Sequence, residues 1–222
     1  MKIWTALFCL ALALPGGALL LLRNTKAAAK VEPAILNSPA TMRFEIDPAR
    51  SKFIVHAHRG GLAWFKGHDH LIEVRDFSGR VELTSDALNP ASLQMNIRSA
   101  SLEETSDVFT SQQKGIIKKE LDNIVLESAK YPEITFRSTD IKGSLKNRAF
   151  EVKIGGDITL HGITKHIVIP ATVTVEGGSL HAKGEFDLNR SDFNVKATSA
   201  FHGMVRVKNK LTFDFDIVGR PA

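Results

Sequence analysis

The sequence predicts an all-β protein, an antiparallel β-barrel of about eight strands with one amphipathic helix. Apolar and polar residues alternate with a period of two over most of the chain from Met42 onward, as in strands with one buried and one solvent-facing side. Turn residues separate these stretches at Asp47-Pro48, Ser78-Gly79, Asn89-Pro90, His161-Gly162 and Gly177-Gly178. Strands with one apolar face must bring those faces together, and long strands joined by short turns favour a barrel over a sandwich.

The predicted strands form two groups. Short alternating stretches occupy residues 44–46, 53–57, 81–83, 93–97 and 134–136, and longer ones occupy 151–160, 166–176, 180–188 and 211–217. The longer stretches carry a charged or hydroxyl residue at almost every second position, so one side of each strand is expected to face water.

Residues 108–130 interrupt this pattern. Apolar residues recur there at helical spacing, at Ile116, Ile117, Leu121, Ile124, Val125 and Ala129. Charged residues at 118–120 and 122 take the other side, which predicts an amphipathic helix. The helix is expected to end before Tyr131-Pro132, because a residue that precedes proline disfavours helical backbone. Such a helix would cap the mouth of the barrel or lie along its side.

The first 29 residues predict export. Lys2 is followed by uncharged residues from Ile3 to Leu22, then by Arg23, Lys26 and three alanines, which is the layout of a signal peptide. The apolar stretch is also long enough to span a bilayer, so an inner-membrane anchor is the alternative. Residues 30–41 then form a linker and residues 42–220 the barrel domain, which in either case is expected in the periplasm.

Composition excludes several classes of protein. The net charge is +5, but residues 30–222 hold 26 basic and 24 acidic residues. The domain therefore has little excess positive charge with which to bind the phosphates of a nucleic acid, and no nucleic-acid partner is expected. Cys9 is the only cysteine, which excludes disulfides, cysteine-based metal sites and a thiol nucleophile in the domain. The common catalytic motifs are also missing, so we expect a protein that is not an enzyme.

The inward side of the predicted strands is almost free of charge. Its large members are Phe44, Phe53, Val55, Val152, Ile154, Ile158, Phe186, Phe213 and Phe215, and its small members are Gly156, Ala171, Ala182 and Gly184. Side chains of this kind either interlock as a filled core or line an elongated apolar cavity. The pattern alone does not decide, because alternation carries no information about volume.

Paired histidines give a second candidate site. His56 and His58 flank Ala57, and His68 and His70 flank Asp69; in a strand, this spacing places both rings of a pair on one face. Such rings could bind Zn²⁺ or Cu²⁺, with His68 and His70 as the better candidates. Since Ala57 belongs to the apolar side, His56 and His58 are expected to face solvent. His161 and His166 bracket a turn and are expected to stabilise it.

Several stretches, in order, resemble the YceI-like family. They are residues 44–51 (FEIDPARS), 76–79 (DFSG), 130–138 (KYPEITFRS), 156–165 (GDITLHGITK) and 189–193 (NRSDF). The resemblance covers residues 43–218. It departs from the family at residues 56–70, where a short turn is usual, and at residues 121–126.

This resemblance implies a periplasmic, lipocalin-like barrel with an apolar tunnel for a polyisoprenoid or another long-chain lipid. It therefore favours the cavity over the filled core. The implied function is a non-enzymatic lipid binder or carrier that exchanges its ligand with membranes, with bound lipid in place of a cofactor. Both departing segments are expected to border the tunnel entrance, with Trp64 and Phe65 in the first of them. Any head-group selectivity is expected in residues 64–70 or in the helix of residues 108–130. A His-rich metal-binding or redox- or stress-associated envelope module is the alternative, and a purely structural or stress-protective barrel is a third. A homodimer is left open.

Overall fold

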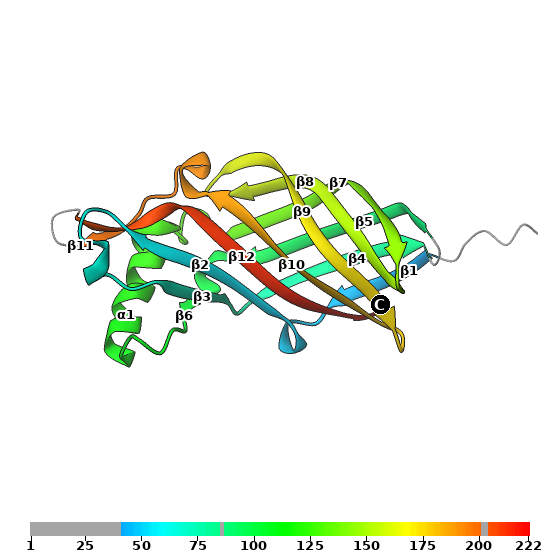
Figure 1. The fold of residues 1–222 in the computed structure, drawn as a ribbon, viewed down its shortest axis with the longest axis horizontal. Helices are drawn as coiled ribbons and strands as arrows, with labels where there is room; N and C mark the ends of the chain where they lie inside the picture. The colour runs from blue at the N-terminus through cyan, green and yellow to red at the C-terminus, as the bar shows by residue number, and fades with distance from the viewer. Residues whose placement is uncertain (1–40, 85–86, 201–203) are drawn as a thin grey trace, which may run out of the picture. The chain divides into compact units, whose positions relative to one another are not determined.

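The computed structural model describes residues 41–84, 87–200 and 204–222. It confirms an all-β fold built on an antiparallel barrel with one α-helix (Figure 1). The strands are β1 (Thr41–Ile46), β2 (Lys52–Gly60), β3 (His70–Val74), β4 (Phe77–Thr84), β5 (Ala87–Arg98), β6 (Leu102–Glu104), β7 (Glu133–Lys146), β8 (Ala149–Leu160), β9 (Ile163–Glu176), β10 (Ser179–Asn189), β11 (Ser199–Ala200) and β12 (Val205–Pro221). Residues 1–29 and almost all of the expected linker lie outside the described residues.

Eight strands close the barrel. The order β1-β4-β5-β7-β8-β9-β10-β12 returns to its start because β1 also pairs with β12, with Phe44 opposite Pro221 and Ile46 opposite Gly219. The backbone N–H of Ala222 adds a hydrogen bond to the Arg43 carbonyl. Closure leaves these strands without an open edge at that end, which is how barrels avoid edge-to-edge association.

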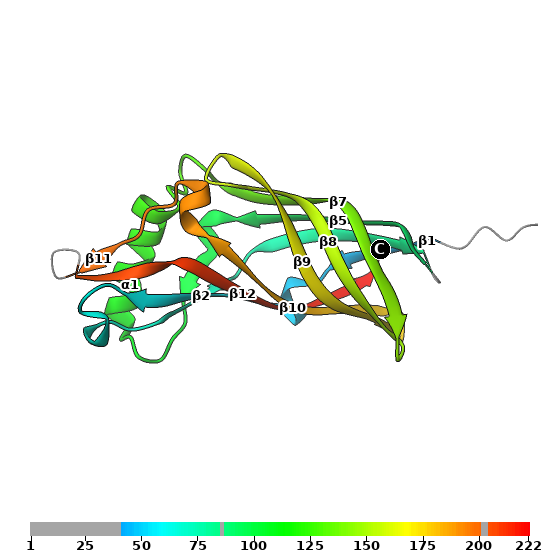
Figure 2. The ribbon, with the colours of Figure 1, turned by 45° about the horizontal axis from the view of Figure 1, so that its top comes forward.

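The long strand β12 changes partner along its length. Near its C-terminus it pairs with β1, whereas residues 206–216 pair with β2. From β2 the sheet continues through β3 to β6, so these three strands extend the wall at the end where the helix lies (Figure 2). We call this end of the barrel the helix end.

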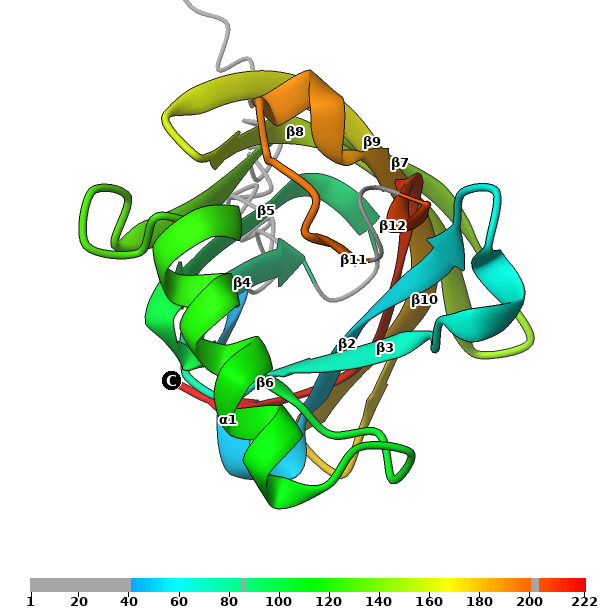
Figure 3. The same cartoon turned by 90° about the vertical axis from the view of Figure 1, so that its left-hand side faces the viewer.

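The helix is α1 (Ser111–Glu120), which continues as one π turn over Leu121–Val125. It begins at a capping box, in which the Thr110 hydroxyl accepts from the Gln113 N–H while the Gln113 side chain accepts from the Thr110 N–H. Figure 3, viewed from the helix end, shows α1 lying across that end of the barrel. The helix is shorter than predicted, since the π turn ends at Val125. Ile116 and Ile124 are exposed, because only the side of the helix that carries Ile117, Leu121 and Val125 faces the barrel.

Two predicted turns are confirmed by backbone geometry. His161-Gly162 joins β8 to β9, and Gly177-Gly178 joins β9 to β10, each with positive φ at both residues. Asn147-Arg148 forms a third turn of this kind between β7 and β8, one that the sequence pattern did not predict. Positive φ at both central residues matches the right-handed twist of the flanking strands.

Two other predicted turns are wrong. Ser78-Gly79 lies inside β4, and Asn89-Pro90 lies inside β5. Gly79 is needed there for a different reason, since a Cβ at this position would stand 2.6 Å from both the Gln94 carbonyl oxygen and Ile46 Cδ1. The glycine permits a close approach of strands, which local sequence does not distinguish from a turn.

Alanine at Gly162 is expected to destabilise the barrel more than alanine at Gly178. Both residues have a φ near +77° (+76° and +78°), which costs an L-residue about 1–2 kcal/mol. A Cβ on Gly162 would also lie 2.7 Å from the Tyr131 ring, whereas a Cβ on Gly178 would approach only Pro221, at 3.9 Å. We expect the extra loss in the free energy of unfolding to be at least about 1 kcal/mol in urea denaturation. Equal losses in the two variants would contradict this role for the Tyr131 contact.

Among the residues that the structure describes, no helix has both the length and the apolar character needed to cross a bilayer.

Candidate functional site

The barrel encloses two apolar cavities arranged along its length. The near chamber, of about 160 Å³, lies at the helix end and is lined in part by Val55, Leu102, Ile117 and Leu121. The far chamber, of about 120 Å³, is lined in part by Val152, Ile154, Ala182 and Phe215. The inward side chains therefore do not fill the barrel, and the cavity interpretation is the one that the structure supports.

The two chambers share a common wall. Phe53, Ile97, Ile134, Ile158 and Phe186 line both of them, and we call this set the waist. The two aromatic rings of the waist pack against rings that line one chamber each. Phe186 stacks on Phe213 with ring centroids 4.9 Å apart, and the Phe53 ring centroid lies 6.4 Å from that of Phe215. The chambers thus follow one another along the inside of the barrel, and the waist separates them. We call the two chambers together the tunnel.

The size of the chambers restricts what they can hold. A dry apolar cavity of about 150 Å³ accepts a molecule the size of benzene, and the two chambers have volumes close to this value. Two such spaces in series, separated by the side chains of the waist, suit a flexible hydrocarbon chain that can pass between those side chains better than a broad fused-ring compound. Since nearly all of the lining is apolar, the chain must be apolar along most of its length.

Most predicted lining residues lie in these chambers. Val55 and Phe213 line the near chamber, Val152, Ile154 and Phe215 line the far chamber, and Phe53, Ile158 and Phe186 belong to the waist. Phe44 lines neither chamber; it is buried in a small cluster with Leu83 and Leu180, which do line the far chamber. It packs where β1 meets β4 and β12, so an inward apolar residue in this barrel need not face the tunnel.

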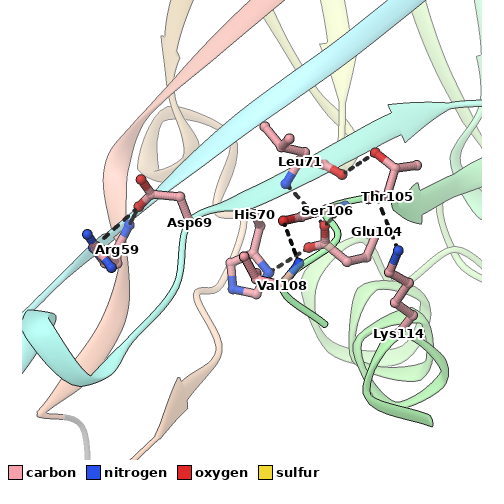
Figure 4. A network of polar contacts seen from close by, with 9 residues as sticks. All are labelled: Arg59, Asp69, His70, Leu71, Glu104, Thr105, Ser106, Val108 and Lys114. Carbon is pink, nitrogen blue, oxygen red and sulfur yellow. Dashed lines mark hydrogen bonds and ion pairs between the residues drawn. The ribbon is translucent and has the colours of Figure 1, made fainter. Parts of the chain in front are cut away.

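Trp64 and Phe65 do not line the tunnel either. They form a 3-10 turn in the β2–β3 loop, with 53% and 64% of their surface exposed. The loop is fixed at its base, where the Arg59 N–H donates to Asp69 Oδ1 at 2.8 Å (Figure 4) and the Ala63 N–H donates to the Met204 carbonyl. The Arg59 hydrogen bond is the main cause that lowers the pKa of Asp69 below its ordinary value. Both rings therefore lie outside the barrel on an anchored loop.

The lining also has a polar part, which the sequence pattern did not predict. Glu120, Arg190, Lys196 and Thr198 line the near chamber, and we call them the mouth. Lys196 is exposed and the other three are half-buried, so the near chamber reaches the surface here. The one available signal was the family-like stretch 189–193, which contains Arg190. Residues 195–198 have no regular periodicity that would predict their direction.

His68 and His70 lie against an aromatic ring and a buried acid. The His70 ring stacks on Phe109, with centroids 5.1 Å apart, and His68 meets the same ring edge-on at 5.6 Å. His70 Nδ1 lies 2.8 Å from Glu104 Oε2, and the other Glu104 oxygen accepts from the N–H groups of Leu71 and Ser106 (Figure 4). This network ties β3 to β6 and the segment that follows.

No metal centre forms around these histidines within the described part of the chain. Residues 41–84, 87–200 and 204–222 contain no group of three or more His, Cys, Asp or Glu side chains placed to hold a metal ion. His56 and His58 lie on the outer side of β2 as predicted, with their rings stacked 6.5 Å apart. His161 contributes to its turn by contacting the Tyr131 ring at 4.3 Å and Glu127 Oε2 at 2.7 Å.

A sequence profile of the YceI-like domain matches residues 44–219, which is most of the chain and nearly all of the barrel. The chain belongs to the YceI-like family. The two stretches that most resemble the family, residues 130–138 and 156–165, meet in the structure where Tyr131 packs on His161 and against Gly162.

Curated members of the YceI-like family align with part of the chain. The UPF0312 protein of Pseudomonas savastanoi pv. phaseolicola is 37% identical over 120 residues, which are 50% of this chain and 57% of that protein. Protein YceI of Escherichia coli O157:H7 is 31% identical over 144 residues, 61% of this chain and 66% of that protein. The aligned part therefore spans less than two thirds of each relative.

Solved structures extend the likeness to the whole barrel. BcnA of Burkholderia cenocepacia gives a TM-score of 0.61 at 21% identity and covers 78% of this chain and 98% of its own. A polyisoprenoid binding domain from Saccharophagus degradans gives 0.57 at 11% identity and covers 82% and 99%. At these identities the likeness shows the YceI-like fold alone.

Proposed function

We propose that this protein binds a long-chain apolar lipid, such as a polyisoprenoid or a fatty-acyl molecule, and carries it across the periplasm without chemical change. The observation that carries this proposal is the tunnel, in which two apolar chambers meet at the waist and the near chamber reaches the surface at the mouth. The structurally similar Saccharophagus degradans domain, described as polyisoprenoid binding, supports the same ligand class.

The energetics favour exchange over storage. Each buried CH₂ contributes about 0.8 kcal/mol relative to water, so a tail of about ten carbons contributes about 8 kcal/mol before ordering costs. Relative to a bilayer the gain is close to zero, because lipid tails are as apolar as the tunnel. A lipid bound in the tunnel can therefore return to a membrane, which is what a carrier requires.

The surface of the helix end supports contact with a membrane. Leu62, Trp64, Phe65 and Met204 are exposed there, and the Arg59 guanidinium lies 5.5 Å from the centre of the Trp64 ring. Exposed aromatic and aliphatic side chains beside basic ones are typical of surfaces that insert into the lipid headgroup region. The β2–β3 loop lies at the same end of the barrel as α1 and the segment between β10 and β11 (Figure 1), which carry the mouth residues. Docking through this loop would therefore bring the tunnel to the bilayer.

The periplasmic location rests on residues 1–29, for which a cleaved signal peptide and an inner-membrane anchor are the two alternatives. Both would place the barrel outside the cytoplasmic membrane. N-terminal sequencing of the protein from its own cells distinguishes cleavage from retention.

Lipid extraction and native mass spectrometry of the full chain, purified from its own envelope, test the binding function. We expect a long, largely apolar molecule to be released. In a second arm, loaded protein is mixed with anionic phosphatidylglycerol vesicles, and the double variant Trp64→Ser/Phe65→Ser is expected to slow transfer without changing affinity. A protein that is isolated empty and binds no long-chain probe would overturn the proposal, and transfer at an unchanged rate would remove the docking role of the loop.

A further inference from the structure

The mouth of the tunnel carries more positive than negative charge. Arg190 and Lys196 lie in it with the hydroxyl of Thr198, and Glu120 is the one carboxylate that lines the near chamber in the described residues. His70 also lines this chamber, but it is paired with Glu104. All the other residues that line the near chamber have apolar side chains. The charged groups are thus concentrated where a bound tail would leave the tunnel.

Arg190 is held in place with part of its guanidinium unused. It begins a 3-10 turn that is anchored by Phe193, which is 1% exposed, and its Nη1 donates to the Val195 carbonyl at 2.9 Å. Its Nε is buried and has no hydrogen-bond partner among the described residues. Buried donors without acceptors are rare in proteins, because water has been lost and nothing replaces it. The Arg190 side chain also lines the near chamber, so its guanidinium lies beside the position that a head group at the mouth would take.

The free donors of the guanidinium identify the acceptor. With Nη1 occupied, Arg190 retains N–H donors on Nη2 and Nε, and a guanidinium with free donors favours the oxygens of a carboxylate or phosphate. Nη2 can donate directly, whereas Nε is buried and joins it only if neighbouring side chains shift. Lys196 adds a second positive charge from the exposed side of the mouth, and it forms no ion pair with any residue that the structure describes. A cationic head group would be repelled here, and an alcohol could use only one of the donors.

We propose that the lipid has an anionic head group, a carboxylate or a phosphate, which Arg190 and Lys196 hold at the mouth while the tail occupies the two chambers. This inference rests on the proposed lipid-binding function. It assigns the ligand class as amphiphiles with one negative end, such as fatty acids or isoprenoid phosphates, and it gives the ligand a defined direction in the tunnel.

Three ligands with the same tail test the head-group site: hexadecanoate, hexadecyl phosphate and hexadecan-1-ol, each measured on the full chain by displacement of a fluorescent probe. We expect at least one anion to bind at least about tenfold more tightly than the alcohol, as for a charge-assisted hydrogen bond. The two anions distinguish a carboxylate from a phosphate. Arg190→Gln is expected to abolish the preference without changing alcohol affinity, and Lys196→Gln to reduce it.

Matched variants keep the result interpretable. Arg137→Gln removes an exposed arginine of β7 and is expected to change nothing, whereas Arg190→Lys should keep part of the preference. Since Lys196 is exposed, its variant tests the proposal even where Arg190→Gln does not fold. If the wild-type protein binds all three ligands equally, the anionic site is wrong and the lipid-binding function stands. If none of the three binds, both are wrong.

Discussion

Replacing Glu104 with alanine is expected to lower the free energy of unfolding by about 3 kcal/mol. The Glu104 carboxylate is fully buried and accepts hydrogen bonds from the N–H groups of Leu71 and Ser106, while its second oxygen lies 2.8 Å from His70 Nδ1. Alanine would leave two backbone donors and one ring nitrogen without this partner. Urea denaturation measures the loss directly.

Glu104→Gln is the matched control. Its amide oxygen still accepts from the backbone donors, and its size is unchanged, so we expect a loss within about 1 kcal/mol. The alanine variant should also bind lipid more weakly than the glutamine variant. The reason is that Ile72, Val74 and Leu102, which lie on the strands β3 and β6 that Glu104 holds together, line the near chamber. Similar small losses in both variants would mean that Glu104 does not hold these strands together.

Much of the fold follows from local sequence. Alternation between apolar and polar residues sets which side of a strand is buried, so the strands β8 to β10 can be located from the sequence alone. The closure of the barrel through β1 and β12 joins residues that are far apart in the chain, and no local pattern indicates it. Gly79 shows the same limit, because its role depends on Ile46 and Gln94 in neighbouring strands.

The site was predictable to the extent that it consists of strand residues. Phe186 and Phe213 face the tunnel because they share the apolar side of their strands, and alternation locates that side. The tunnel volume was not predictable, because it depends on how side chains from opposite strands fit together. Trp64, Arg190 and Lys196 lie in loops and turns, where no period relates sequence to direction. The direction of the aromatic rings in the loop therefore could not be predicted, and Arg190 and Lys196 were not predicted at all.

Filling the far chamber is expected to shorten the lipid that the protein can bind. Ala182 lines this chamber on β10, opposite Ile217 and Val173, and a phenylalanine there would project into a space of about 120 Å³. Tail carbons excluded from the chamber lose about 0.8 kcal/mol each. We therefore expect Ala182→Phe to weaken hexadecanoate binding by tenfold or more, while hexanoate, whose short tail the near chamber can bury, binds as it does to the wild-type protein.

The dependence on chain length separates this effect from general damage to the barrel. In the wild-type protein, affinity should rise with each CH₂ until the tail reaches the end of the far chamber. In Ala182→Phe the rise should stop several carbons earlier, because the ring blocks the tunnel beyond the waist. Glu185→Phe adds the same ring to the outer side of the same strand, where Glu185 is exposed, and should keep the wild-type profile. A uniform loss for short and long chains alike would indicate general damage to the barrel. Unchanged affinity at every chain length would show that the tail does not pass the waist, and the ligand would then occupy the near chamber only.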